Sequence, residues 1–176
     1  MNRSIKLSLA TLALVVTAGT AQAQSGNVTA EATVLSPLTL TPIRTLQFGN
    51  TFPGVLKTVA ATDAANSGAI QVIGSGTSEV AVSAPSMTVT LACVGTCTGG
   101  VATPITLNVS ASALAGGIDA TPGNSTAFTL GTAGANRNLV GGNLFVLIGG
   151  SLTPASNQAA GLYRGTVQIN AAYTGL

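Results

Sequence analysis

The sequence has no histidine and no tryptophan, and charged residues make up only 6% of its 176 positions. Without histidine, the chain lacks the usual general base of serine and cysteine hydrolases and the commonest protein ligand for metals. Aromatic residues make up 3% of the chain, too few for a platform on which sugars or bases could stack. These absences predict that the protein is not an enzyme and carries no cofactor.

Acidic residues are equally scarce, and they are at least 16 positions apart in the sequence. A pair of carboxylates of the kind that glycosidases use would have to meet in space. Two of the four fall on the polar sides of predicted strands, where a solvated face is the simpler interpretation. The other two lack the clustered oxygen ligands that calcium requires. The four residues are Glu31, Asp63, Glu79 and Asp119.

Residues 1–23 have the three parts of a secretory signal peptide. Arg3 and Lys6 supply the positive charge, residues 7–16 are apolar, and a small-x-small cleavage site ends at Ala23. The apolar part is too short to span a bilayer, which takes about 20 residues. We therefore expect a chain that is exported without a membrane span, in which residues 24–176 form a single domain. Its expected location is the periplasm in transit, then the cell surface, a fimbrium or the medium.

Once the signal peptide is set aside, four basic and four acidic residues remain, so the formal net charge is zero. A chain without a basic patch cannot neutralise phosphates, which argues against a nucleic-acid partner. Low charge also removes the repulsion that keeps proteins apart, and it predicts self-association. The basic residues are Arg44, Lys57, Arg137 and Arg164.

Short alternating runs separated by Gly, Pro, Asn and Ser predict an all-β sandwich or barrel. Residues 143–148 form a continuous apolar run, which is typical of a strand covered on both faces. A turn is expected at Gly149 and Gly150. The other predicted strands are 28–34, 38–41, 46–49, 55–61, 69–73, 79–83, 87–91 and 105–109, with a weaker indication around Phe128 and Leu130.

The clearest alternation is at residues 161–173, which we call the C-terminal run. Polar side chains occupy one face, and the other face is apolar or glycine throughout. Because successive side chains of a strand point to opposite faces, the pattern predicts one long, half-buried strand. The apolar face consists of Gly161, Tyr163, Gly165, Val167, Ile169, Ala171 and Tyr173.

The two cysteines, Cys93 and Cys97, are predicted to form a disulfide in an exported chain. A loop this short stabilises less than a long one, so its expected role is to pin the tip of a hairpin. The alternative is a redox pair, but the usual spacing of such pairs is Cys-x-x-Cys.

Both ends of the exported chain are strand-like and have few of the residues that block edge-to-edge pairing. Val28, Ala30, Ala32 and Val34 alternate with polar residues near the start. This segment and the C-terminal run either pair within one molecule or pair between molecules by strand addition. The residues alone leave both arrangements open.

The C-terminal run resembles the last strand of chaperone–usher pilins, with a Gly, alternating apolar positions and a Tyr near the end. Gly161 and Tyr173 match that pattern. Both ends of the exported chain also resemble bacterial exported domains akin to the Mat (common pilus) fimbrillins and spore-coat U proteins. The matching pieces are residues 38–41, 46–49, 149–152 and the Gly161-x-Tyr163-x-Gly165 segment with Tyr173.

The resemblance implies an immunoglobulin-like antiparallel β-sandwich that serves as a structural subunit of a surface fibre or coat. It implies a periplasmic chaperone and an outer-membrane usher as partners, and strand complementation between subunits. The acceptor groove would be lined by Val167, Ile169, Ala171 and Tyr173, and Gly161 would leave room at one end. Val28, Ala30, Ala32 and Val34 would be the donated residues.

Two other classes of function stay open at this stage. A secreted monomeric sandwich could act as an adhesion or binding module, with a ligand site in the loops of residues 110–142. An enzyme would require two of the four acidic residues to meet in one cleft.

Overall fold

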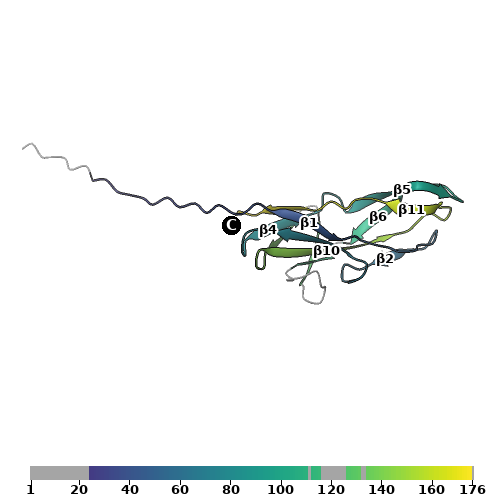
Figure 1. Cartoon of the computed structure of the whole chain (residues 1–176), viewed down its shortest axis with the longest axis horizontal. Coiled ribbons are helices and arrows are strands. Elements are labelled where there is room, and N and C mark those ends of the chain that lie inside the picture. Colours follow the sequence, from purple (N-terminus) through teal and green to yellow (C-terminus); the bar gives the residue numbers. More distant parts are fainter. Residues whose placement is uncertain (1–23, 111, 116–125, 132–133, 176) are drawn as a thin grey trace, which may run out of the picture. The chain divides into compact units, whose positions relative to one another are not determined.

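The computed structural model describes residues 24–110, 112–115, 126–131 and 134–175 (Figure 1). The predicted signal peptide lies outside the described residues. The chain divides into two units, residues 1–33 and residues 34–176, and every strand among the described residues belongs to the second. The described residues contain no helix. The fold class predicted from the sequence, all-β, is confirmed.

The second unit is an antiparallel β-sandwich, since every pair of named strands runs antiparallel. The described strands are β1 (Thr39–Arg44), β2 (Lys57–Val59), β3 (Gly68–Ile73), β4 (Glu79–Ser83), β5 (Thr88–Thr98), β6 (Ile105–Ser110), β7 (Ser112–Ala115), β8 (Thr126–Thr129), β9 (Ala135–Asn138), β10 (Asn143–Leu152), β11 (Ala160–Arg164) and β12 (Asn170–Tyr173).

Two sheets and a two-stranded ribbon organise these strands. The larger sheet has the order β1-β3-β10-β6-β5-β11, and β2 also pairs with β10. The smaller sheet has the order β12-β4-β9, and β7 pairs with β8. One apolar core joins the two sheets, because it draws side chains from both. Its fully buried members include Val72, Val80, Val82, Leu139, Leu144 and Val146.

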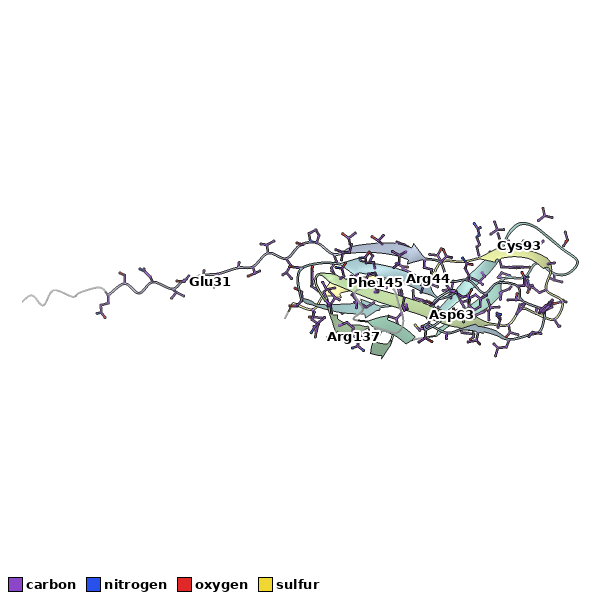
Figure 2. The ribbon with its side chains drawn as sticks, turned by 60° about the horizontal axis from the view of Figure 1, so that its bottom comes forward. Glu31, Arg44, Asp63, Cys93, Arg137 and Phe145 are labelled. Atoms are coloured by element: carbon purple, nitrogen blue, oxygen red, sulfur yellow. A yellow bond between two sulfur atoms is a disulfide. The ribbon has the colours of Figure 1, made fainter. Side chains whose placement is uncertain are left out.

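Strand β10 lies at the centre of the larger sheet and is buried on both faces, as the continuous apolar run predicts. Leu144, Val146 and Ile148 belong to the main core. Leu147, on the opposite face, packs against Ala61 and Ala69 in a second small cluster. Phe145, labelled in Figure 2, alternates with these core residues and is also buried.

The turn predicted at Gly149 and Gly150 is wrong, because β10 continues through both glycines to Leu152. A Cβ on Gly149 would press against the backbone of Val59 and Ala61. One on Gly150 would lie 2.8 Å from the carbonyl oxygen of Asn108. These glycines therefore mark a close approach of neighbouring backbones and not a reversal of the chain.

Two of the predicted strands, 28–34 and 46–49, do not form strands in the structure. Leu46 and Phe48 do pack against the main core, so their alternation correctly marks a buried face. The backbone of that segment makes an isolated hydrogen bond, from the Gln47 N–H to the Asn66 carbonyl, and Gly49 then adopts a φ of 60°. In residues 28–34 no ladder forms, and Val28 is 93% exposed.

Candidate functional site

The C-terminal run is not the single strand that its alternation predicts. Its first part lies in β11, which pairs with β5 in the larger sheet. Its last part is β12, which pairs with β4 in the smaller sheet. Residues 165–169 between them form no ladder, so the run passes from one sheet to the other.

Unequal chain lengths explain why the ladder breaks. Arg164 pairs with Ala92, and Asn170 pairs with Ser83. Five residues of the run lie between these pairs, whereas eight residues of the opposite chain do. The extra residues of the opposite chain include Pro85 and the first residues of β5, and these residues of β5 pair with β6 on their other side.

Despite the break, the apolar face of the run stays directed at the core along its length. Ile169 is buried in the main core. Tyr163, Val167, Ala171 and Tyr173 pack against that core while remaining partly exposed. The alternation therefore predicts which face is apolar, although it does not predict where hydrogen bonding stops.

The outer side of the run is an unpaired edge in both sheets. β11 is the last strand of the larger sheet and β12 is the last strand of the smaller one. Each pairs with a single neighbour among the described strands. An edge of this kind presents backbone N–H and C=O groups that another strand can pair with. We call this outer side the acceptor edge.

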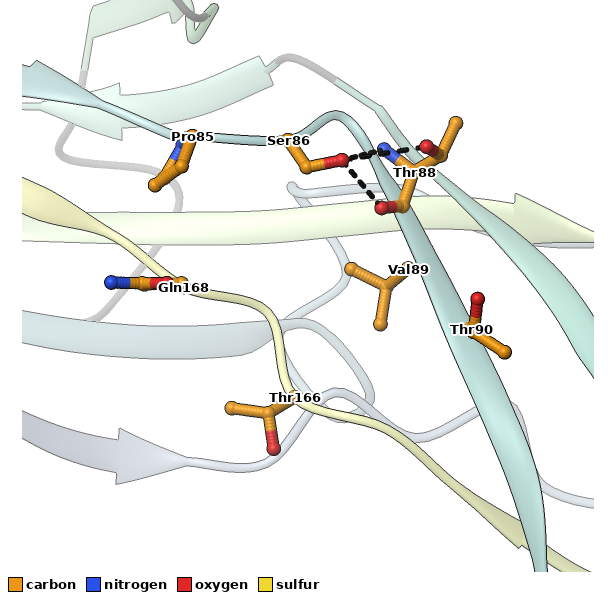
Figure 3. A pocket seen from close by; sticks show the side chains of 7 residues that line it. All are labelled: Pro85, Ser86, Thr88, Val89, Thr90, Thr166 and Gln168. Carbon is orange, nitrogen blue, oxygen red and sulfur yellow. Dashed lines mark hydrogen bonds between the residues drawn. The ribbon is translucent and has the colours of Figure 1, made fainter.

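A pocket of about 300 Å³ lies where the run leaves β5 (Figure 3). Thr166 and Gln168 of the run contribute to one wall, and Thr88, Val89 and Thr90 contribute to the wall formed by β5. The lining is uncharged and rich in hydroxyl groups. Ser86 Oγ already donates to the Thr88 carbonyl oxygen at 2.6 Å. The pocket is a gap between diverging strands and offers no nucleophile paired with a base.

The two tyrosines of the chain fix the two ends of the run. Tyr163 donates from its hydroxyl to the Ala159 carbonyl at 3.0 Å, four residues upstream. Such a bond from near the start of a late strand is characteristic of the tyrosine corner of immunoglobulin-like sandwiches. Tyr173 donates to the Ser36 carbonyl at 2.8 Å and accepts from the Ser75 N–H at 2.7 Å.

Gln158 supports the first of these anchors and was not found from the sequence. Its side chain is buried, and its Nε2 donates to the Tyr163 hydroxyl at 2.7 Å and to the Thr103 carbonyl at 2.6 Å. Its Oε1 accepts from the Thr103 hydroxyl at 3.2 Å. An amide five residues before a tyrosine is the only trace of this arrangement in the sequence.

The predicted disulfide between Cys93 and Cys97 is present, but it does not pin a hairpin tip. Both cysteines lie within β5, on either side of a bulge that contains Gly95 with a φ of 81°. At this bulge, residues 95–97 of β5 lie opposite the single residue Gly161 of β11. Figure 2 labels Cys93 toward one end of the sandwich. The bond clamps an irregular stretch that faces the run.

The resemblance implies that Gly161 leaves room for a donated strand, but the structure shows another use for the space. A Cβ at Gly161 would collide with the Sγ of Cys97, and it would lie 3.1 Å from the Cys97 Cβ. Gly161 therefore makes room for the disulfide of its own chain. The glycine and the disulfide form one structural unit.

The candidate donor residues Val28, Ala30, Ala32 and Val34 are exposed and carry no strand. Because residues 1–33 form a separate unit, only Val34 of the four belongs to the β-sandwich unit. Val34 is 93% exposed, as is Val28.

The described acidic residues do not form a cluster with metal-binding potential, and Asp119 lies outside the described residues. Glu79 accepts a hydrogen bond from the Asn136 amide at 3.0 Å. Asp63 caps a turn: its carboxylate accepts from the Asn66 side chain at 2.9 Å and from two backbone N–H groups. These bonds lower the pKa of Asp63, with the Asn66 side chain as the largest cause.

A family model described as Domain of unknown function (DUF4402) matches residues 38–173. The chain belongs to this family. The matched DUF4402 domain begins one residue before β1 and ends with the last residue of β12, so it contains every described strand. No curated protein and no solved structure matches the chain. Within the described part of this DUF4402 protein, no helix is long and apolar enough to cross a membrane.

Proposed function

We propose that this DUF4402 protein is an exported structural subunit of a bacterial surface fibre or coat. The acceptor edge of one copy pairs with residues 28–34 of another copy by β-strand addition. One observation carries the proposal: the C-terminal run lies at an unpaired edge in both sheets of the sandwich. A strand added along this edge bonds to backbone groups that β11 or β12 leaves unpaired.

The side chains of the run support the same arrangement. Val167, Ala171 and Tyr173 reach the core yet stay partly exposed, so an added strand would remove further apolar surface from water. Val28, Ala30, Ala32 and Val34 are small, alternate with polar residues and are exposed in the free chain. Small side chains fit beside a core that is already closely packed.

The predicted signal peptide and the low charge fit this proposal. An exported chain with an open edge would need protection before it assembles, and a periplasmic chaperone that lends a strand would provide it. Delivery by an outer-membrane usher follows from the resemblance to pilins. A chain with balanced, sparse charges offers little electrostatic resistance to self-association. No catalytic step enters this proposal.

The test compares two double variants of the mature chain. Ala30→Arg with Ala32→Arg places charge on the apolar side of the candidate donor segment, and Thr29→Arg with Thr33→Arg adds the same charge on its polar side. We expect the unmodified chain and the threonine variant to form SDS-resistant ladders and the alanine variant to stay monomeric. Size-exclusion chromatography and unheated SDS gels measure the outcome.

Two results would contradict the proposal. If the unmodified mature chain is a stable monomer, a secreted adhesion or binding module that does not polymerise becomes the better assignment. If the alanine variant assembles as well as the unmodified chain, association does not use this segment.

A further inference from the structure

Three apolar side chains stand exposed on one ordered loop. Phe52, Val55 and Leu56 are 69%, 54% and 64% exposed, and we call them the end patch. The loop is held by a hydrogen bond from the Val55 N–H to the Phe52 carbonyl at 3.1 Å. A second bond joins the Gly54 N–H to the Pro154 carbonyl at 2.9 Å. A rigid loop that keeps apolar groups in water is typical of a contact surface.

The end patch adjoins the beginning of the C-terminal run. A pocket of about 400 Å³ beside it is lined by Phe52 and Pro53 from the loop. Gly161 and Tyr163, at the start of the run, line the same pocket. The loop that carries the end patch and the start of the run therefore share one pocket.

The chain enters the β-sandwich at the opposite end of the run, near Tyr173. Tyr173 binds the Ser36 carbonyl just before β1, so the chain enters the sandwich beside the last residues of the run. Figure 1 shows the same separation, with the C-terminus marked at one end of the sandwich and β2 and β11 at the other. We call the first of these the Tyr173 end; its exposed turn contains Ser75 and Thr77.

The link between donor segment and sandwich is short, and this constrains how two copies meet. Only residues 35–38 separate Val34 from β1. Four residues span at most about 14 Å when fully extended. The Tyr173 end of the donating copy must therefore lie close to wherever its Val34 is bound.

The direction of the donated strand then decides which surfaces meet. If the strand runs parallel to the C-terminal run, its Val34 lies beside Tyr173 of the acceptor, and two like ends meet in a closed pair. If it runs antiparallel, its Val34 lies beside Gly161, and the Tyr173 end of one copy meets the end patch of the next. Only this second contact joins unlike surfaces and can continue indefinitely as a fibre.

We propose that the end patch and its adjoining pocket bind the Tyr173 end of the next copy of this chain. This inference rests on the proposed function and adds a second, body-to-body contact to the donated strand. Contact would bury Phe52, Val55 and Leu56, which the isolated sandwich leaves in water. The end patch would then set the orientation of successive subunits and reinforce each strand exchange.

Matched variants test the apolar contact. Val55→Thr with Leu56→Gln removes it, and Val94→Thr with Ile43→Gln is the control. Val94 on β5 and Ile43 on β1 are comparably exposed, 45% and 43%, and neither belongs to the C-terminal run or to the end patch. We expect the end-patch variant to raise the concentration needed for assembly at least tenfold, and the control to change it less than twofold. Equal effects of the two variants would overturn the inference.

A second measurement separates this inference from the proposed function. Labelled peptide 24–36 is added to a mature chain whose own donor is blocked by Ala30→Arg and Ala32→Arg. Fluorescence anisotropy should give the same affinity, within twofold, whether or not the end-patch substitutions are present. A peptide that fails to bind either protein contradicts the proposed function. A peptide that binds more than tenfold more weakly to the end-patch variant shows that the patch acts on the strand itself and overturns the inference.

Cross-linking tests the contact directly. Chains with Leu56→Cys and chains with Thr77→Cys are assembled separately and as a mixture, then treated with a short bismaleimide. The native cysteines are bonded to each other, so only the introduced thiols react. We expect covalent dimers only when the two kinds of chain are assembled as a mixture. Dimers from Thr77→Cys chains alone would show that like ends meet, and no dimers in assembled mixtures would show that these ends do not meet; either result overturns the inference.

Discussion

Strand β10 and the C-terminal run are the two most regular apolar patterns in the sequence, yet they fold differently. β10 is ten residues long, unbroken and paired on both sides. The C-terminal run is divided between two sheets, and each of its strands pairs on one side only. The first pattern is apolar at nearly every position, whereas the second alternates. A continuous pattern therefore marks the strand that holds the sandwich together, and an alternating pattern marks a strand that still has a free edge.

The difference also separates stability from availability for binding. Neighbours on both sides fix the hydrogen bonds and side chains of β10, so changes there should affect folding. The C-terminal run has fewer partners, so changes on its outer side should affect association more than folding. The following predictions test this distinction, beginning with the largest expected effect.

Gly149→Ala should be the most damaging change. The added Cβ meets the backbone of Val59 and Ala61, which cannot move without displacing β2 and its surroundings from β10. We expect a loss of about 3 kcal/mol of unfolding free energy, measured by urea denaturation. Gly131→Ala is the control, because a Cβ there meets no atom within 4 Å. Equal stabilities of the two variants would contradict the close approach at β10.

Gln158→Leu should cost about 2 kcal/mol, because it leaves the Thr103 carbonyl and the Tyr163 hydroxyl without their buried donor. Gln168→Leu removes an exposed amide of the same size from the outer face of the run. Its effect should stay within about 0.5 kcal/mol. Thermal unfolding of both variants measures the contrast. If Gln168→Leu proves the more damaging, the anchor at the start of the run is misassigned.

Gly161→Ala should cost about 1 to 2 kcal/mol while the disulfide is intact, since the new methyl group collides with the Cys97 sulfur. In a Cys93→Ala, Cys97→Ala background, the same substitution should cost less than half as much. A double-mutant cycle from denaturant midpoints measures this coupling. Additive effects would show that Gly161 and the disulfide act independently.

The smallest effect should be that of acid on the turn at Asp63. Because folding lowers the pKa of this carboxyl, its contribution is complete above the unfolded value and is lost as pH falls through the lower folded value. The Asp63→Ala variant should therefore differ from the parent at neutral pH, and the difference should vanish in strong acid. Unfolding curves between pH 7 and about pH 2 would show the convergence. A difference that grows in acid would reverse the sign of this interpretation.

The sequence predicted the fold class, the disulfide, the doubly covered strand at 143–148 and the apolar face of the run. Each depends on local periodicity or on residue type, which a single sequence contains. It did not predict that β10 continues through Gly149 and Gly150, because glycine looks the same in a turn and in a tight backbone contact. The break at residues 165–169 depends on a length mismatch with a distant segment, which no local pattern reveals. Gln158 and the end patch were missed for the same reason: their meaning comes from what they face.

The bond between the Tyr173 hydroxyl and the Ser36 carbonyl has a mechanical consequence. Tension applied through the N-terminal segment enters the sandwich at Ser36 and continues into β1 along its axis. β1 is joined to β3 by a ladder whose hydrogen bonds are perpendicular to that pull. All hydrogen bonds of the β1–β3 ladder then bear the shear force together, so they cannot break one after another. The tyrosine contact would break first, and β1 would hold until most of its ladder yielded together.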